Sequence, residues 1–418
     1  MSRRFFVPAV VLAAFLSMLL VQRQLSAQEA PGQETPAQEA PAPQPPAQEV
    51  PPPAEPAPAP APADQGAAKE AALDPQQARA AYEAKFAEWK EALKELRTMK
   101  HDYQLADEAK RADLEQQWTV KLAAATALLP SVANAAIGAF RAAANEDREL
   151  ATFLVKLLQD YVANDQYEAA AALGNALIDG QCDMLQIYRE AGMANFAINN
   201  LDRTLEILEK ADATNAMSGD SRELRKAVEQ YKGFWAQEQE LRQKEAAADD
   251  LPRVKLTTSK GVIVLELFEN EAPETVGNFI SLVKKGFYNG LTFHRVIAGF
   301  MAQGGCPDGD GTGGPGYAIY DECEKPVIRY HFRGSLSMAK TNAPNSGGSQ
   351  FFICFRPAPD LNGKHTVFGR VVEGLDVLDK LQRIDPEKDK DNPPAPDSIV
   401  TAEVLRDRGH EYLPHKVE

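Results

Sequence analysis

Residues 293–305 read Phe-His-Arg-Val-Ile-Ala-Gly-Phe-Met-Ala-Gln-Gly-Gly, and this stretch decides the fold of the carboxyl-terminal part of the chain. Arg295 stands inside an apolar run that is typical of a buried strand. A permanent cation is costly to bury unless it is paired or serves a site. One interpretation is a surface arginine at the end of a strand. The other, which we favour, is an apolar pocket with one positioned hydrogen-bond donor.

Four more motifs follow this stretch. They are Gly311-Thr-Gly-Gly, Ser337-Met-Ala, Ser349-Gln-Phe-Phe-Ile and Leu361-Asn-Gly-Lys-His-Thr-Val-Phe-Gly. Together with residues 293–305 they resemble the cyclophilin family of peptidyl-prolyl isomerases, roughly over residues 252–408. Several motifs in this order are not expected by chance. The resemblance implies a closed antiparallel eight-stranded β-barrel capped by two helices, and an enzyme that rotates X-Pro peptide bonds without a cofactor.

The resemblance also implies roles for single residues. Arg295 would donate hydrogen bonds that strengthen as the amide twists, and its guanidinium stays charged at any working pH. Gln303 would orient Arg295 or bind the substrate backbone. The proline pocket would consist of Phe300, Met301, Phe352 and Leu361, with His365 at its wall. The edge of the groove, which contacts an extended substrate, would consist of Gln350, Ala339 and Lys340.

One position departs from the family's pattern. Many members carry tryptophan just before the leucine of the proline pocket, whereas this chain carries Asp360 there. All three tryptophans of the chain precede residue 250. Because that tryptophan contributes to cyclosporin binding in the family, we expect weak sensitivity to cyclosporin with isomerase activity retained.

The residues of 252–410 also predict many short strands and two helices. Val254–Thr257 and Gly261–Phe268 are rich in β-forming residues and flank a short turn, which predicts a hairpin. One helix is expected to begin at Ala272-Pro273 and end at Gly286. A second helix is expected over Leu375–Leu381, and further strands over Phe293–Val296, Phe300–Gln303, Gly334–Met338, Phe351–Phe355, Thr366–Val372 and Ile399–Leu405. This pattern favours a closed barrel.

The four cysteines of the chain are too few and too scattered for a disulfide scaffold. The spacing of cysteines and histidines predicts no metal site. Cys306 and Cys323 flank the glycine-rich loop 308–316. In an exported protein they could form a disulfide. Two reduced thiols are the alternative, and the sequence does not choose between them.

Length and charge limit the classes of function. A chain of 418 residues is too long for one ordinary domain, so two or three are expected. The net charge of −15 argues against partners that are nucleic acids or acidic membrane surfaces.

The first 27 residues predict export to the periplasm or the cell exterior. Ser2-Arg3-Arg4 precedes an apolar run over residues 5–21, and Leu25-Ser26-Ala27 offers small residues for cleavage, as in a secretory signal peptide. The alternative is an uncleaved membrane anchor, because the run nearly reaches the length that spans a bilayer. Residues 28–72 are dominated by Pro, Ala, Gln and Glu, and we expect a disordered linker.

Residues 73–249 are rich in Ala, Leu, Glu, Lys and Gln and predict a helical interaction domain. Asp74 as N-cap and Pro75 in the first turn predict where its first helix begins. A second helix over residues 106–129 is expected to stop before Pro130. Shorter helices are expected over residues 132–143, 147–163, 166–179, 184–197, 200–212 and 220–246.

This helical domain contains a weak period. Residues 164–169 and 198–203 align at a shift of 34 residues, and each is a polar turn followed by an amphipathic helix. The period resembles the tetratricopeptide repeat. An unrelated helical bundle is the alternative, because only about two copies are visible. We expect the domain to hold a protein partner or client, or to dimerise, and its sequence predicts no catalytic constellation.

Two hypotheses of function follow. The first is an exported peptidyl-prolyl isomerase that helps folding by acting on unfolded or extended proline-containing chains. The second is a scaffold that binds proline segments without turnover while the helical domain selects the partner. The combination of Arg295 with Phe300, Gln303, Phe352 and His365 favours the enzyme. Residues 411–418 are expected to be a polar tail.

Overall fold

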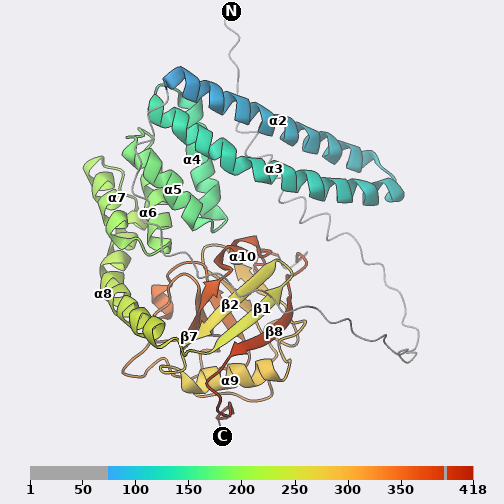
Figure 1. The fold of residues 1–418 in the computed structure, drawn as a ribbon, viewed down its shortest axis with the longest axis vertical. Helices are drawn as coiled ribbons and strands as arrows, with labels where there is room; N and C mark the ends of the chain where they lie inside the picture. Colours follow the sequence, from blue (N-terminus) through green and yellow to red (C-terminus); the bar gives the residue numbers. More distant parts are fainter. Residues whose placement is uncertain (1–73, 390–392, 418) are drawn as a thin grey trace, which may run out of the picture.

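The computed structural model describes residues 74–389 and 393–417. The predicted export segment 1–27 and the predicted linker 28–72 lie outside the described residues. A helical part from Pro75 to Ala248 leads into a part built from strands and two helices (Figure 1). This order confirms the predicted helical region followed by a β-rich region.

A long helical hairpin stands at the amino-terminal end of the described chain. Its first helix, α2 (Pro75–Leu105), begins as predicted, and the Asp74 side chain accepts a hydrogen bond from a backbone amide of the first turn. Trp89, Leu93 and Leu96 of α2 are almost completely buried, and α2 packs along α3 (Glu108–Ala142).

Helix α3 continues through Pro130, so the predicted stop before this residue is wrong. A proline inside a helix removes one backbone hydrogen bond and costs about 3 kcal/mol. Val132, Ala136 and Phe140 lie beyond the proline and are at most 1% exposed. Their burial in the core offsets the cost of the proline. The two helices expected over 106–129 and 132–143 are therefore a single helix.

Five further helices extend from this hairpin: α4 (Arg148–Ala163), α5 (Tyr167–Asp179), α6 (Ile187–Ala197), α7 (Leu201–Ala213) and α8 (Gly219–Ala248). The turns before α5 and α7 have the same conformation. Asp165 and Asn199 adopt φ angles of 64° and 63°, and in each turn the next amide bonds to the carbonyl five residues earlier. The 34-residue period therefore corresponds to two equivalent turns, while the likeness to tetratricopeptide repeats stays a prediction.

Eight antiparallel strands form one sheet in the order β3-β4-β6-β5-β7-β2-β1-β8. In chain order they are β1 (Arg253–Thr258), β2 (Gly261–Leu267), β3 (Arg295–Ile297), β4 (Met301–Gly304), β5 (Ser335–Met338), β6 (Phe351–Cys354), β7 (Val367–Glu373) and β8 (Ile399–Arg406). The two helices α9 (Pro273–Lys284) and α10 (Leu375–Lys380) lie at opposite ends of the sheet in Figure 1. Each strand and helix lies within a few residues of its predicted position.

The prediction of a closed barrel is wrong, because the sheet stays open between β3 and β8. Strand β3 has only three residues, and its central residue Val296 exchanges both backbone hydrogen bonds with Ile384, which lies in a loop. The loop thus occupies the edge that β8 would need. Between the two ends of the sheet, residues 290–293 and 397–399 are joined by three backbone hydrogen bonds and by the isolated bridge Thr292–Ser398, but the strands β3 and β8 do not pair.

Alternation along the short strands separates two faces of the sheet. The inner face carries a row of cross-strand neighbours, Val296, Ala302, Ile353 and Leu336, which are at most 1% exposed and belong to the main core. Successive side chains of a strand point to opposite faces. The residues next to this row therefore point outward, and they carry the candidate site.

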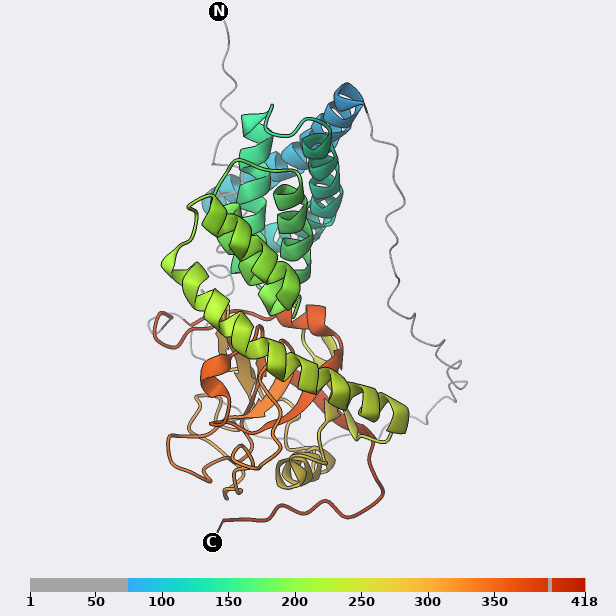
Figure 2. The same cartoon turned by 90° about the vertical axis from the view of Figure 1, so that its left-hand side faces the viewer.

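Helix α8 lies along the β-rich part of the chain (Figure 2). Its Tyr231 hydroxyl donates a hydrogen bond to the His331 carbonyl at 3.0 Å and accepts one from the Asn362 amide at 3.2 Å. The Tyr231 ring also packs edge-on against Phe332 at 5.4 Å. The helical region is therefore packed directly behind the loops that support the candidate site.

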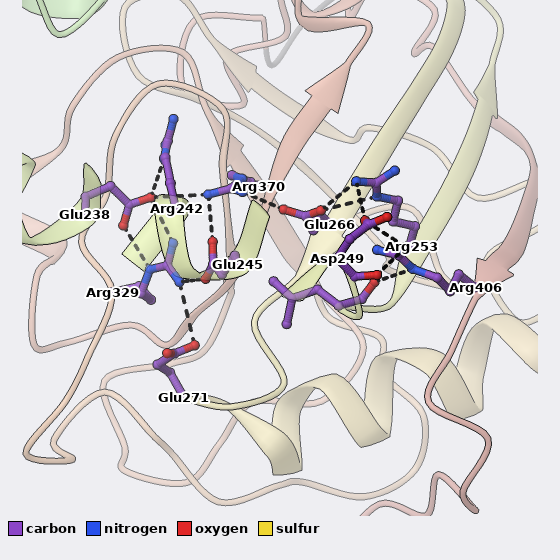
Figure 3. Close-up of polar contacts among 11 residues, drawn as sticks. Glu238, Arg242, Glu245, Asp249, Arg253, Glu266, Glu271, Arg329, Arg370 and Arg406 are labelled. Atoms are coloured by element: carbon purple, nitrogen blue, oxygen red, sulfur yellow. Dashed lines mark hydrogen bonds and ion pairs between the residues drawn. The ribbon is translucent and has the colours of Figure 1, made fainter. Parts of the chain in front are cut away.

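A buried cluster of ion pairs reinforces this interface (Figure 3). The Arg329 side chain, fully buried, pairs through two nitrogens with Glu238 of α8 at 2.8 and 2.9 Å and also binds Glu245 of α8. Arg370 of β7 forms an ion pair with Glu245, with 3.0 Å between the nitrogen and the oxygen. Removing one partner of a buried pair leaves an uncompensated charge and costs about 3–5 kcal/mol. The cluster therefore fixes how α8 lies on the sheet.

Candidate active site

Four adjacent strands bring the first part of the site together. In the register of β3, β4, β6 and β5, one outward-facing row consists of Arg295, Gln303, Phe352 and Ser337. The next row on the same face contains Ile297, Met301 and Cys354. Residues that are 57 positions apart in the sequence thus become neighbours, and the arginine lies beside the apolar side chains.

Arg295 lies at the edge of an apolar pocket and is half-buried. Its Nη1 lies 3.5 Å from Gln303 Oε1 and 3.9 Å from the Met301 sulfur, and the guanidinium carbon lies 5.9 Å from the centre of the Phe300 ring. Among the described residues, no partner engages its other nitrogens. Several N–H donors of the fork therefore remain available to a bound chain.

Gln303 continues a chain of side-chain hydrogen bonds. Its amide donates to Gln350 Oε1 at 2.9 Å, and the Gln350 amide donates to the carbonyls of Gly311 and Gly313 at 2.8 Å each. The glycine-rich loop thereby holds Gln350, Gln350 holds Gln303, and the Gln303 oxygen is directed toward Arg295. This geometry supports an orienting role for Gln303.

The apolar pocket is a small cluster separate from the main core. Its buried members are Met301, Phe352, Cys354 and Ala358, and the half-buried Ile297, Phe300, Ala339 and Leu361 pack against them. Strands β4 and β6 supply the base of the cluster, and the short 3-10 helix Pro359–Leu361 supplies Leu361. The structure thus brings together the four predicted pocket residues Phe300, Met301, Phe352 and Leu361, and Ala339 of the predicted groove edge packs against them.

His365 forms the predicted wall of this pocket. Its ring lies edge-on to Phe352 with centroids 5.5 Å apart, and its Nδ1 lies 3.0 Å from the Met338 carbonyl oxygen. The carbonyl can only accept, so Nδ1 carries a proton. The hydrogen bond fixes the ring beside the pocket.

Lys340 is the predicted site residue whose side chain points elsewhere. Its ammonium pairs with Asp321 at 3.0 Å, and both side chains are largely buried. The Ala339 amide, next to it, bonds to the Gln350 carbonyl at 2.9 Å. A contact between Lys340 and substrate would therefore have to use its backbone.

Comparisons with known proteins decide the family. A model of the family described as "Cyclophilin type peptidyl-prolyl cis-trans isomerase/CLD" matches residues 253–404. The peptidyl-prolyl cis-trans isomerase of Helicobacter pylori is 53% identical over 148 residues, which are 35% of this chain and 88% of that protein. This chain belongs to the cyclophilin-type peptidyl-prolyl cis-trans isomerases.

Two further likenesses concern the same part of this cyclophilin. Peptidyl-prolyl cis-trans isomerase B of Bacillus subtilis is 53% identical over 127 residues, which are 30% of this chain and 87% of that protein. A crystal structure of a cyclophilin type peptidyl-prolyl cis-trans isomerase from Cryptosporidium parvum has 35% identity and a TM-score of 0.35, and the match covers 38% of this chain and 99% of that chain.

Isomerisation needs no covalent step from a cyclophilin. The X-Pro amide resists rotation because its nitrogen shares a lone pair with the carbonyl, which gives a barrier of about 18–20 kcal/mol. In the twisted state the nitrogen is pyramidal and more basic, so a hydrogen-bond donor beside the amide binds that state more strongly than either planar state. Each 1.4 kcal/mol of such preference raises the rate about tenfold.

Sequence reasoning missed the residues that support the pocket from behind. The fully buried His331 ring stacks parallel to Phe352 at 5.8 Å, and its nitrogens lie 2.9 Å from Asn362 Oδ1 and 3.0 Å from Ser337 Oγ. Burial lowers the pKa of His331 to about 4. The one signal available was its place just before the strand Ser335–Met338, which is too weak to identify a supporting residue.

The cysteines near the site are free thiols, and one of them, Cys354, belongs to the apolar pocket. Cys306 and Cys323 are both free and buried. Of the two predicted alternatives, the structure therefore has the two reduced thiols and not the disulfide. Burial raises the pKa of Cys354, which lies under the proline pocket. Among residues 74–389 and 393–417, no group of three His, Cys, Asp or Glu side chains could hold a metal ion.

Proposed function

We propose that this cyclophilin is an exported folding helper that isomerises X-Pro bonds in unfolded or extended client chains. The observation that carries the proposal is the half-buried Arg295, whose free donors border an apolar pocket on the outward face of an open sheet. A site on an outward face is accessible to a segment of an extended chain, and it does not require a folded partner of one particular shape.

The sequence supports the export part of this proposal. The basic start and the apolar run over residues 5–21 are typical of a secretory signal, and the linker after them would separate the folded part from the membrane or the export point. The helical region, with its two equivalent turns before α5 and α7, would hold a client or a protein partner next to the isomerase site.

Two experiments test the proposal. Fractionation of cells, with amino-terminal sequencing of the mature protein, should find the chain outside the cytoplasm. The full chain should also accelerate the refolding of a client whose slow phase is limited by proline isomerisation. A cytoplasmic location would refute export. A client whose slow phase keeps its rate, although the client binds, would favour the non-catalytic scaffold instead.

A further inference from the structure

A cleft of about 480 Å³ lies where the helical region meets the isomerase domain. Its helical wall carries Met193 and Phe196 of α6 with Leu224 and Ala227 of α8, and its other wall carries Phe300 and Leu361. Small-ligand and peptide side-chain sites usually measure about 300–1,000 Å³ and are mostly apolar. In size this cleft matches such a site. Its apolar side chains can bind apolar groups, and charged side chains also line it.

The cleft is continuous with the proline pocket. Phe300 and Leu361 pack against the buried pocket residues Met301 and Phe352, and they also line the cleft. One pair of half-buried side chains is thus shared by both spaces. Because an extended chain advances about 3.3 Å per residue, residues only a few positions from a bound proline reach the cleft.

The walls of the cleft are held in a fixed relation to each other. The Arg356 side chain donates to the Gly299 carbonyl and lies 3.0 Å from the Met193 sulfur, so it joins the turn before Phe300 to helix α6. Asn362, next to Leu361, donates to the Tyr231 hydroxyl of α8 at 3.2 Å. A preformed cleft loses less conformational freedom when it binds a chain.

The charges at the cleft favour one kind of client. Asp360 is exposed at its rim, and no ion pair engages it among the residues that the structure describes. Two cations also line the cleft: Lys226 is paired with Glu223 at 2.9 Å, and the Arg356 guanidinium is engaged by the Gly299 carbonyl and the Met193 sulfur. An unpaired carboxylate beside apolar side chains attracts a lysine or arginine that follows or precedes an apolar residue.

We propose that this cleft is a second subsite of the isomerase site, which binds the apolar and basic residues of a client chain that flank the proline. The proposal rests on the proposed function. It makes the helical region part of the substrate site: a client would contact α6 and α8 while its prolyl bond lies at Arg295. Position 360 would then select clients.

The test compares peptides that share one prolyl bond. A short Ala-Ala-Pro-Ala peptide fills the proline pocket alone, and two longer peptides extend it with leucine and lysine on the amino or the carboxyl side. The wild-type full chain should isomerise one of the longer peptides with a kcat/KM about tenfold higher than the short one. Ala227→Trp, which fills the cleft, should remove this gain.

Two variants serve as controls. Ala236→Trp places the same side chain on an exposed position of α8 away from the cleft and should keep the gain. Asp360→Asn should lower the preference for lysine over glutamate in the extension. The inference is overturned if neither extension increases kcat/KM, or if the gain survives in Ala227→Trp.

Binding measured without turnover separates this inference from the proposed function. The fluorescence anisotropy of a labelled long peptide should show about tenfold weaker binding to Ala227→Trp than to Ala236→Trp. If this difference appears while no peptide is isomerised, the subsite stands and the catalytic function fails. Equal binding by both variants, with short-peptide turnover intact, overturns the subsite and leaves the catalytic function standing.

Discussion

The Asp165 carboxylate of the helical region accepts a hydrogen bond from the Gly299 amide at 2.7 Å. Gly299 forms the turn between β3 and β4, where its φ of 70° favours glycine. Asp165 is fully buried and also pairs with Arg383 at 2.7 Å. One residue of the helical region therefore holds the hairpin that carries Arg295 and Phe300.

Asp165 is accordingly expected to be a positioning residue. Asp165→Ala should lower kcat/KM for a prolyl peptide about tenfold or more, because the hairpin loses its anchor and small displacements of a catalytic group are costly. Asp165→Asn keeps an acceptor for the Gly299 amide and should restore most of the activity. Both variants remove the carboxylate that forms the ion pair with Arg383, so both should unfold at lower temperature.

The comparison of the two variants separates positioning from stability. Activity is measured at a temperature at which circular dichroism shows both to be folded. Equal losses of kcat/KM in Asp165→Asn and Asp165→Ala would mean that the hydrogen bond to Gly299 does not position the hairpin.

Arg329 is expected to dominate the stability of the domain interface. Arg329→Met leaves Glu238 and Glu245 buried without their principal partner, which should cost about 3–5 kcal/mol. Urea unfolding measures the loss. Lys94→Ala breaks the exposed pair with Glu91 and should leave the free energy of unfolding close to that of wild type. Losses of the same size in both variants would show that the buried cluster is not the main support of the interface.

His331 is expected to make stability depend on pH. Its folded pKa of about 4 lies below the ordinary value of 6.5, so the unfolded chain binds a proton in this window and the folded chain does not. The contribution of the neutral His331 to the free energy of unfolding is fully present above pH 6.5. It is lost as the pH falls toward 4, and the total loss is about 3 kcal/mol. The free energy of unfolding should therefore fall less steeply in His331→Gln than in wild type. Parallel curves would contradict this assignment.

Asp360 is expected to weaken cyclosporin binding. Asp360→Trp should raise the affinity for cyclosporin about tenfold or more, because an aromatic side chain at the rim of the pocket adds a large apolar contact. The affinity is measured by titrating cyclosporin and recording the inhibition of peptide turnover. Lys364→Trp adds the same side chain at an exposed position nearby and should have no such effect. Tight inhibition of the wild type would contradict the prediction.

The part of the fold that short-range patterns control could be predicted from the sequence. The hairpin of β3 and β4, with Arg295 opposite Gln303, follows from strand alternation and from the motif that contains both. The first helix follows from Asp74 and Pro75 at its amino terminus. In these places local preference and tertiary structure agree.

Long-range packing decided the rest. Pro130 predicts the end of a helix, but the buried residues beyond it keep the helix continuous. The sheet stays open because Ile384 occupies the edge of β3, and this residue lies far from Val296 in the sequence. The contacts of Asp165 with Gly299 and of Tyr231 with His331 join residues 134 and 100 positions apart, and no local pattern in the sequence predicts them.

The most direct test concerns Arg295 itself. Exchange of the prolyl bond in the short peptide, followed by NMR without a coupled protease, should be catalysed by the wild-type chain. Arg295→Ala should be at least about 100-fold slower, since removal of one preorganised donor costs that much, and Arg295→Lys should also be impaired because it lacks the planar fork. The exposed control Lys364→Ala should keep the wild-type rate. Equal exchange rates in wild type and Arg295→Ala would contradict the catalytic role of this site.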